Sequence, residues 1–236
     1  MESFRKNIVN QVEKMPEGRI FTIKDLDFDI SKSANVNVLL SELVKKDKLK
    51  RVEKGAYYRY GMSKLGLGPK PIYQEEKIRY ITTKIGGYPS GYYMYNQMGL
   101  TEQVPAVITI ATPNPVREFK FVNLRINCIK AYKEDAKSDE IDYLRVLDAI
   151  RQMKHIPGKT SNDIYRGLKN LFFIKYSDKD IRMITRLARL YPPKVRMTIA
   201  MLLQDTGHRD ISEDVVKSVN PITRNKYSKK ERYGTT

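Results

Sequence analysis

The stretch SANVNVLLSELVKKDKLKRVEKGAYYRY, residues 33–60, joins a helical pattern to a pattern of two short strands. In its first half, apolar side chains recur at the spacing of one helix face. This spacing predicts a helix that opens at Ser31 or Ser33 and runs to about Lys46, with one face buried. The apolar face consists of Val36, Leu39, Leu40, Leu43 and Val44.

The opposite face of this predicted helix is small and polar, and it is free to contact a partner. Asn can form two hydrogen bonds with adenine, small apolar groups can touch thymine methyls, and Lys can reach phosphate. A solvent-facing helix has a similar composition, so that alternative stays open. The candidate DNA contacts on this helix are Ser33, Asn35, Asn37, Val38, Ser41 and Lys45.

The second half of the stretch predicts a hairpin whose turn is Lys54-Gly55, because a two-residue turn of this kind needs positive φ. Pairing Val52 with Tyr57 would place Lys50 and Arg59 on one face, where they could follow phosphates or the minor groove. The alternative is an edge strand made basic to prevent aggregation. The candidate contacts in this wing are Lys50, Arg51, Lys54 and Arg59.

The residues before this stretch complete the pattern of a winged helix-turn-helix. A first helix is predicted from Ser3 to Met15, and Pro16-Glu-Gly18 ends it. Ile20-Phe21 is extended, and Thr22 can cap a short helix through Asp25. We therefore predict a winged helix-turn-helix domain over residues 1–62 that binds double-stranded DNA.

Composition agrees with a polyanionic partner. The chain has 236 residues, and its 44 Lys plus Arg against 27 Asp plus Glu give a net charge of +17. The most basic part is residues 158–236, where 17 − 8 = +9. The single cysteine, Cys128, fits a reducing compartment and is expected to be a packed core thiol. We see no signal peptide or membrane span, so the expected location is the cytoplasm.

The remainder predicts a mixed α+β domain over residues 70–215, after a glycine-rich linker at 61–71. Strands are expected at 104–111, 116–122 and 124–132 in a small antiparallel meander. Ser138-Asp-Glu is expected to cap a helix, the chain is helical from Ser161, and residues 216–236 form a basic tail. The fold class is therefore α+β, with a helical C-terminus.

One C-terminal helix, opened by Ser177-Asp-Lys-Asp180, carries apolar residues on one side and cations on the other. Its apolar arc includes Ile181, Ile184 and Leu187. The cationic arc could lie along a phosphate backbone, or it could simply face solvent. Its members are Lys179, Arg182, Arg186 and Arg189.

Motifs of enzymes are scarce. There is no P-loop, dinucleotide fingerprint, zinc-ligand cluster or nucleophile elbow, and His155 and His208 stand alone. Glu118-Phe-Lys120 has the local pattern of a restriction-type nuclease, but the nearest earlier acid, Glu102, falls in a turn. We therefore expect no enzyme activity, no metal and no cofactor.

Three segments together resemble the AbiEi-type antitoxins of type IV toxin-antitoxin and abortive-infection systems. They are Lys54-Gly-Ala-Tyr-Tyr58, the run from Gly87 to Pro105, which contains Gly99-Leu-Thr-Glu-Gln-Val-Pro105, and Leu190-Tyr-Pro-Pro-Lys-Val-Arg196. The resemblance spans residues 20 to about 207.

This resemblance implies an N-terminal domain that binds inverted repeats in its own promoter and a C-terminal domain that supplies antitoxicity. The counterpart would be a nucleotidyltransferase-like toxin from the same operon, opposed without a stable complex. A palindromic operator would also favour a homodimer on DNA. The alternative is a ligand-responsive winged-helix regulator whose C-terminal domain senses a small molecule.

Overall fold

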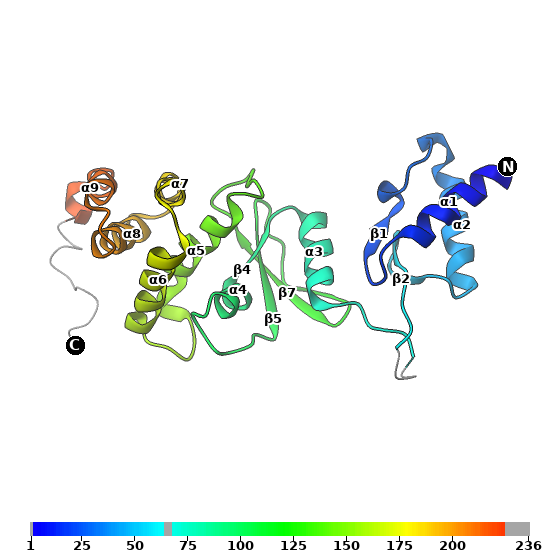
Figure 1. The fold of residues 1–236 in the computed structure, drawn as a ribbon, viewed down its shortest axis with the longest axis horizontal. Coiled ribbons are helices and arrows are strands. Elements are labelled where there is room, and N and C mark those ends of the chain that lie inside the picture. The colour runs from blue at the N-terminus through cyan, green and yellow to red at the C-terminus, as the bar shows by residue number, and fades with distance from the viewer. Residues whose placement is uncertain (1, 64–67, 225–236) are drawn as a thin grey trace. The chain divides into compact units, whose positions relative to one another are not determined.

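The computed structural model describes residues 2–63 and 68–224 and has an α+β fold (Figure 1). The chain forms two compact units, Met1–Lys84 and Ile85–Thr236. The predicted fold class is therefore confirmed at this level. Among the described residues, no helix combines the length and the apolar character that crossing a membrane requires.

The first unit packs helices on a small antiparallel sheet of order β1-β3-β2. Its core contains Ile8 of the first helix, Phe21, Leu40 and Tyr57, all of which are almost fully buried. These side chains come from four different elements, so the unit has a core of its own. The elements are α1 (Glu2–Lys14), β1 (Ile20–Thr22), the 3-10 helices η1 (Ile23–Asp25) and η2 (Ile30–Lys32), α2 (Ser33–Lys45), β2 (Lys50–Glu53), β3 (Ala56–Tyr58) and α3 (Gln74–Ile85).

The helix bounds, the Thr22 cap and the buried face of α2 agree closely with the predictions from local sequence patterns. The first helix ends one residue before the predicted position, and α2 begins at Ser33. Thr22 caps η1 through a capping box, in which its side chain accepts from a backbone N–H and Asp25 accepts from the Thr22 N–H. Val36, Leu39, Leu40 and Leu43 are buried, as the helical spacing predicted.

The predicted register of the hairpin is wrong. Lys50 pairs with Tyr58 and Arg51 with Tyr57, because the ladder is irregular between Arg51 and Glu53. Val52 therefore occupies a bulge, which adds one residue to β2 and changes which side chains lie opposite each other. The turn itself forms as predicted, with φ of 81° at Gly55.

Helix α3 belongs to the first unit, beyond the boundary that the glycine-rich linker suggested. The Ile20 N–H donates to Glu76 of α3 over 2.7 Å, and Arg79 donates to the Ile20 carbonyl over 3.0 Å. The β2–β3 hairpin is also held by α3, since Tyr80 and Lys84 both bond to Glu53 of β2 at 2.7 and 2.5 Å. Residues 64–67 of the predicted linker lie outside the described residues.

The second unit contains a mixed sheet of order β4-β5-β7-β6. The predicted antiparallel meander is wrong, because β5 and β7 are parallel, with Ile108 opposite Ile126. After β5 the chain crosses to the far edge, where β6 forms a hairpin with β7, and β7 then returns beside β5. The strands are β4 (Tyr88–Ser90), β5 (Val107–Thr112), β6 (Phe119–Phe121) and β7 (Leu124–Lys130).

Helices complete the second unit, and α8, in which six of 13 residues are buried, contacts α5, α6, α7 and α9. Capping boxes at Thr160 and Ser177 open α6 and α7, whereas Ser138 caps no helix and α5 begins after Glu140. Helix α9 occupies part of the predicted tail, whose residues 225–236 lie outside the described chain. The helices are α4 (Gly91–Gln97), α5 (Ile141–Gln152), η3 (Met153–His155), α6 (Ser161–Lys175), α7 (Asp178–Ala188), α8 (Pro193–Asp205) and α9 (Arg209–Lys217).

Candidate nucleic-acid interface

The outward face of α2 is exposed, as its spacing predicted. Val38 is 58% exposed despite being apolar, and Asn35, Asn37 and Lys45 are exposed beside it. An open hollow of about 360 Å³ lies along this face and is lined by Asn37, Val38, Ser41, Glu42 and Lys45. An exposed Val among short polar side chains leaves a helix face that can approach another surface closely.

The polar groups on this face are not equivalent. The Asn37 amide donates to the Ser33 carbonyl over 3.0 Å, and the Ser41 hydroxyl donates to the Asn37 carbonyl over 2.8 Å. Asn35, in contrast, forms no side-chain hydrogen bond within residues 2–63 and 68–224. Asn35 can therefore offer both its donor and its acceptor, whereas Asn37 has one donor already committed.

Glu42 was missed by the sequence analysis, although it lies four residues after Val38 and so belongs to the same face. It lines the hollow and forms an ion pair with Arg5 of α1 at 2.5 Å. This pair places a carboxylate and a guanidinium at the edge of the α2 face. The helical spacing was the signal that could have found Glu42; nothing local indicated Arg5.

The cations of the β2–β3 hairpin differ in their exposure and in their partners. Lys54 is exposed at the turn and forms no ion pair within the described chain. Lys50 bonds to Asp47 over 2.5 Å and lies 5.1 Å from the centroid of the Tyr60 ring. This bond raises the pKa of Lys50 and lowers the pKa of Asp47. Arg51 lies over the Tyr57 ring at 5.6 Å.

Arg59 does not join Lys50 on one face, contrary to the prediction. It follows β3, and its guanidinium donates to the Met15 carbonyl over 2.9 Å, with Glu17 at 3.8 Å. The bulge at Val52 is the reason, because it makes Tyr58 the partner of Lys50. Arg59 thus binds the end of α1 and contributes to packing in the first unit.

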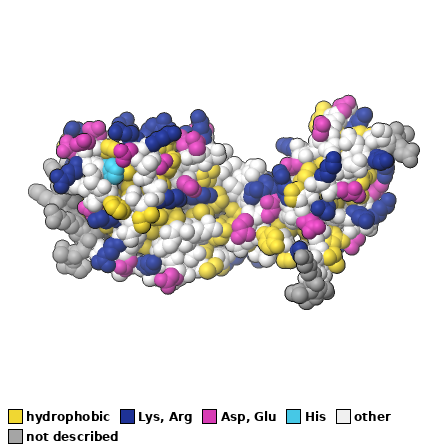
Figure 2. Space-filling model, viewed as in Figure 1, with side chains coloured by type: hydrophobic (Ala, Val, Ile, Leu, Met, Phe, Trp, Pro, Cys, Tyr) yellow, Lys and Arg dark blue, Asp and Glu magenta, His cyan; other side chains and the backbone are white. Residues whose placement is uncertain are grey.

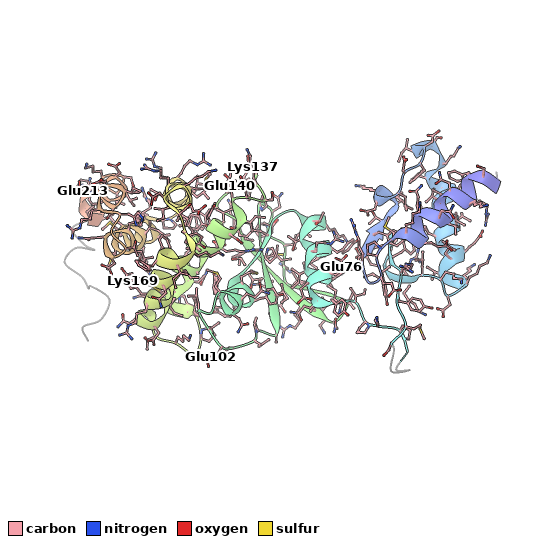
Figure 3. All side chains as sticks on the ribbon, viewed as in Figure 1. Glu76, Glu102, Lys137, Glu140, Lys169 and Glu213 are labelled. Atoms are coloured by element: carbon pink, nitrogen blue, oxygen red, sulfur yellow. The ribbon has the colours of Figure 1, made fainter. Side chains whose placement is uncertain are left out.

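In the second unit, α7 buries Ile181, Ile184, Leu187 and Ala188 and exposes its four predicted cations. Lys and Arg side chains gather along the edge of the surface where α7 lies (Figure 2). Arg186 bonds over 3.3 Å to the buried carboxylate of Glu140. Figure 3 labels Glu140, which directly precedes α5. The other three form no ion pair with any described residue: Lys179, Arg182 and Arg189.

A carboxylate that the sequence analysis did not single out lies in the core of the second unit. Asp148 of α5 is 2% exposed and accepts hydrogen bonds from Tyr88, Ser90 and Tyr191 at 3.1, 2.8 and 2.9 Å. Burial raises the pKa of Asp148, while these hydroxyls and the nearby Arg151 act in the opposite direction. The cluster ties β4, α5 and the segment after α7 together, which is a structural role.

The enzyme-like fragment gains no support from the geometry. Glu118 lies just before β6 and forms an ion pair with Arg125 at 2.7 Å. His208 contacts Asp178 at 3.3 Å, and no metal-binding group of three His, Cys, Asp or Glu occurs in the described part of the chain. Cys128, predicted to be a core thiol, is only half-buried, and burial raises its pKa.

Comparison with known proteins gives a family and a fold. No curated protein matches this chain. The crystal structure of the RV2827C protein from Mycobacterium tuberculosis is similar, with a TM-score of 0.50, 13% identity, and coverage of 92% of this chain and 82% of that chain. At this identity the similarity concerns the fold alone. A family model described as "Family of unknown function (DUF6088)" matches residues 7–189, most of the chain, so this protein belongs to the DUF6088 family.

Proposed function

We propose that the first unit is a winged helix that binds double-stranded DNA, with α2 as its recognition helix. The observation that carries this proposal is the exposed face of α2, which is polar and free of acidic residues apart from Glu42 at its edge. The adjacent β2–β3 hairpin supplies a cation at its turn, Lys54, that has no ion-pair partner among the described residues. A helix for the major groove and a basic hairpin for the backbone are the two parts that this mode of binding needs.

The side chains take different roles in this proposal. Asn35 reads a base edge, because its amide is free on both sides, and Val38 contacts a thymine methyl. Lys45, Arg51 and Lys54 contact phosphates, which positions the helix without reading sequence. Lys50 contributes less, since Asp47 already neutralises it. The exposed cations of α7 would add a second contact for a polyanion.

We further propose that the protein is an antitoxin and autorepressor of a type IV toxin-antitoxin operon. The support for this step is the resemblance of residues 20 to about 207 to AbiEi-type antitoxins, together with a basic first unit that suits DNA. The DNA target would be inverted repeats in its own promoter, bound by two copies of the chain. Its counterpart would be a nucleotidyltransferase-like toxin, and both would act in the cytoplasm.

DNA binding is tested by fluorescence anisotropy with the DNA upstream of its own gene and with a scrambled duplex of equal length. We expect Asn35→Ala to weaken binding to the upstream DNA by about 1 to 3 kcal/mol and to leave scrambled DNA almost unaffected. Asn37→Ala should cost less, because that amide is engaged with Ser33. Asn10→Ala on the exposed side of α1 is the matched control. Equal losses on both duplexes would refute base reading by Asn35.

The antitoxin step needs a separate assay, in which the product of the neighbouring gene is expressed with and without this chain. Rescue of growth by the full chain would support the proposal. Asn35→Ala should release repression of a promoter reporter while rescue persists, because toxin neutralisation is assigned to the second unit. A neighbouring gene whose product is harmless would refute the antitoxin proposal and leave DNA binding standing.

A further inference from the structure

The second unit contains a cavity of about 170 Å³ between the sheet and helix α4. Helix α4 contacts both β5 and α5 (Figure 1). The residues that line the cavity come from α4 and α5 and from the sheet strands β5 and β7. No charged residue of the described chain lines the cavity, which distinguishes it from the basic surfaces above. Its lining consists of Gly91, Tyr92, Tyr95, Thr109, Asn127, Ile129 and Gln152.

The parallel pairing of β5 and β7 builds the polar wall. Thr109 and Asn127 are register partners, so their side chains lie next to each other on one face of the sheet. Gly91 allows α4 to begin close to this wall, because a Cβ atom at that position would lie 2.6 Å from the Thr109 Cβ. Its φ of 67° also favours glycine. The close approach and the polar pair therefore occur at the same place.

The polar side chains that line the cavity, from this wall and from α5, have no hydrogen-bond partners among the described residues. The side chains of Thr109, Asn127 and Gln152 form no hydrogen bond with any of them. Opposite them, Tyr92 is held in place by its hydroxyl, which donates to the His155 carbonyl over 2.6 Å. The Tyr92 ring, which is 37% exposed, gives the cavity an aromatic side, and the fully buried Tyr95 ring packs 6.1 Å from it at an inclination of 60°.

This chemistry selects a particular kind of ligand. Two carboxamides and a hydroxyl offer both donors and acceptors, and amide side chains pair with the edges of nucleobases. An exposed aromatic ring beside such groups, here that of Tyr92, provides a surface on which a base can stack. We propose that this cavity binds a single nucleobase, presented by a nucleoside or by a free end of a nucleic acid.

Size and charge restrict the proposal further. A cavity of about 170 Å³ is smaller than the roughly 300 Å³ at which sites for drug-sized ligands begin, so a base fits and a complete nucleotide does not. Because none of the lining residues is a cation, a phosphate gains nothing there. A 5′-monophosphate should therefore bind no more tightly than the corresponding nucleoside. This site does not depend on DNA binding by the first unit.

The experiment is an NMR titration of the full chain with adenosine, guanosine, cytidine and uridine, each up to about 5 mM, followed by the 5′-monophosphates. We expect at least one nucleoside to bind saturably with a Kd of about 1 mM or tighter, as suits a ligand anchored by some ten base atoms. The perturbed resonances should belong to residues around Thr109 and Asn127. Thr109→Val and Asn127→Leu keep the side-chain size but remove the polar groups, and each should weaken binding about tenfold.

Asn114→Leu is the matched control, because Asn114 is exposed in the loop after β5 and should leave binding unchanged. The proposal is overturned if no nucleoside binds saturably by about 5 mM, if the perturbations map elsewhere, or if Asn127→Leu binds like Asn114→Leu. A monophosphate that binds tenfold more tightly than its nucleoside would also overturn it. If one of the two cavity variants does not fold, the binding of the other variant and the location of the perturbed resonances still test the proposal.

Discussion

Removing the charge of Lys54 should change how DNA binding depends on salt. Lys54 is exposed at the hairpin turn and has no ion-pair partner in the described chain, so its charge is available for a phosphate. A Lys that contacts one phosphate releases about 0.9 counterion, so Lys54→Ala should make the slope of log Kobs against log[salt] shallower by about 0.9. Between about 50 and 200 mM salt, the wild type should lose about 3.5-fold more affinity than the variant, since 4 to the power 0.9 is about 3.5.

Lys50→Ala provides the comparison, because Lys50 lies on the same hairpin but bonds to Asp47 over 2.5 Å. Its removal leaves Asp47 uncompensated and should change the slope by much less than one counterion. Anisotropy titrations of one duplex at four or more salt concentrations give all three slopes. An unchanged slope for Lys54→Ala would refute phosphate contact by the turn. An equal change for Lys50→Ala would refute the inference that Asp47 neutralises it.

Three further predictions concern the second unit. Asp148→Ala removes the shared acceptor of three buried hydroxyl hydrogen bonds, and at about 1 to 1.5 kcal/mol each the free energy of unfolding should fall by about 3 to 4.5 kcal/mol in urea titrations; a fall below about 1 kcal/mol would contradict the cluster's role. Burial raises the pKa of Glu140, but the Lys137 N–H and the cations of Lys133 and Arg186 outweigh it, and the pKa is lowered. The contribution of Glu140 to the free energy of unfolding is therefore fully present above about pH 5 and is lost as pH falls through the lowered pKa. In Glu140→Gln, the free energy of unfolding should fall less steeply between about pH 5 and 3 than in the wild type. Equal slopes for the two proteins would exclude this linkage. Ser177→Ala removes the cap of α7 and should cost about 1 kcal/mol by the same titration, with no loss expected for the exposed Ser138→Ala.

The fold could be predicted from sequence wherever its cause was local. The apolar stripe of α2 and the Thr22 capping box depend on residues within one or two turns, so spacing alone found them. The sheet pairing was not local. Nothing in the strand patterns indicates that β7 lies parallel to β5. The apolar pattern of a short strand determines which face is buried, but it does not determine which strand pairs with it or in which direction. A bulge at Val52 likewise moved Arg59 to the end of α1.

In the candidate interface, too, local features could be predicted from the sequence and contacts between distant groups could not. Helical spacing placed Asn35 and Asn37 on one exposed face, but only the structure shows that the Asn37 amide bonds to the Ser33 carbonyl. The cavity beside α4 was invisible in the sequence, since Thr109 and Asn127 are 18 residues apart and become neighbours only through the parallel ladder. Asp148 gave no sequence signal either, because its donors lie more than 40 residues away.

Helix α3 has a consequence for how the first unit could be studied in isolation. Through Glu76 and Arg79 it satisfies both main-chain groups of Ile20, on the side of β1 that no described strand occupies. An uncovered strand edge invites pairing with the edge of another molecule. A fragment cut at residue 62 would carry the whole proposed DNA-reading surface and would also expose this edge. Such a fragment should associate with itself through β1, whereas one that extends to Lys84 should stay monomeric at the same concentration.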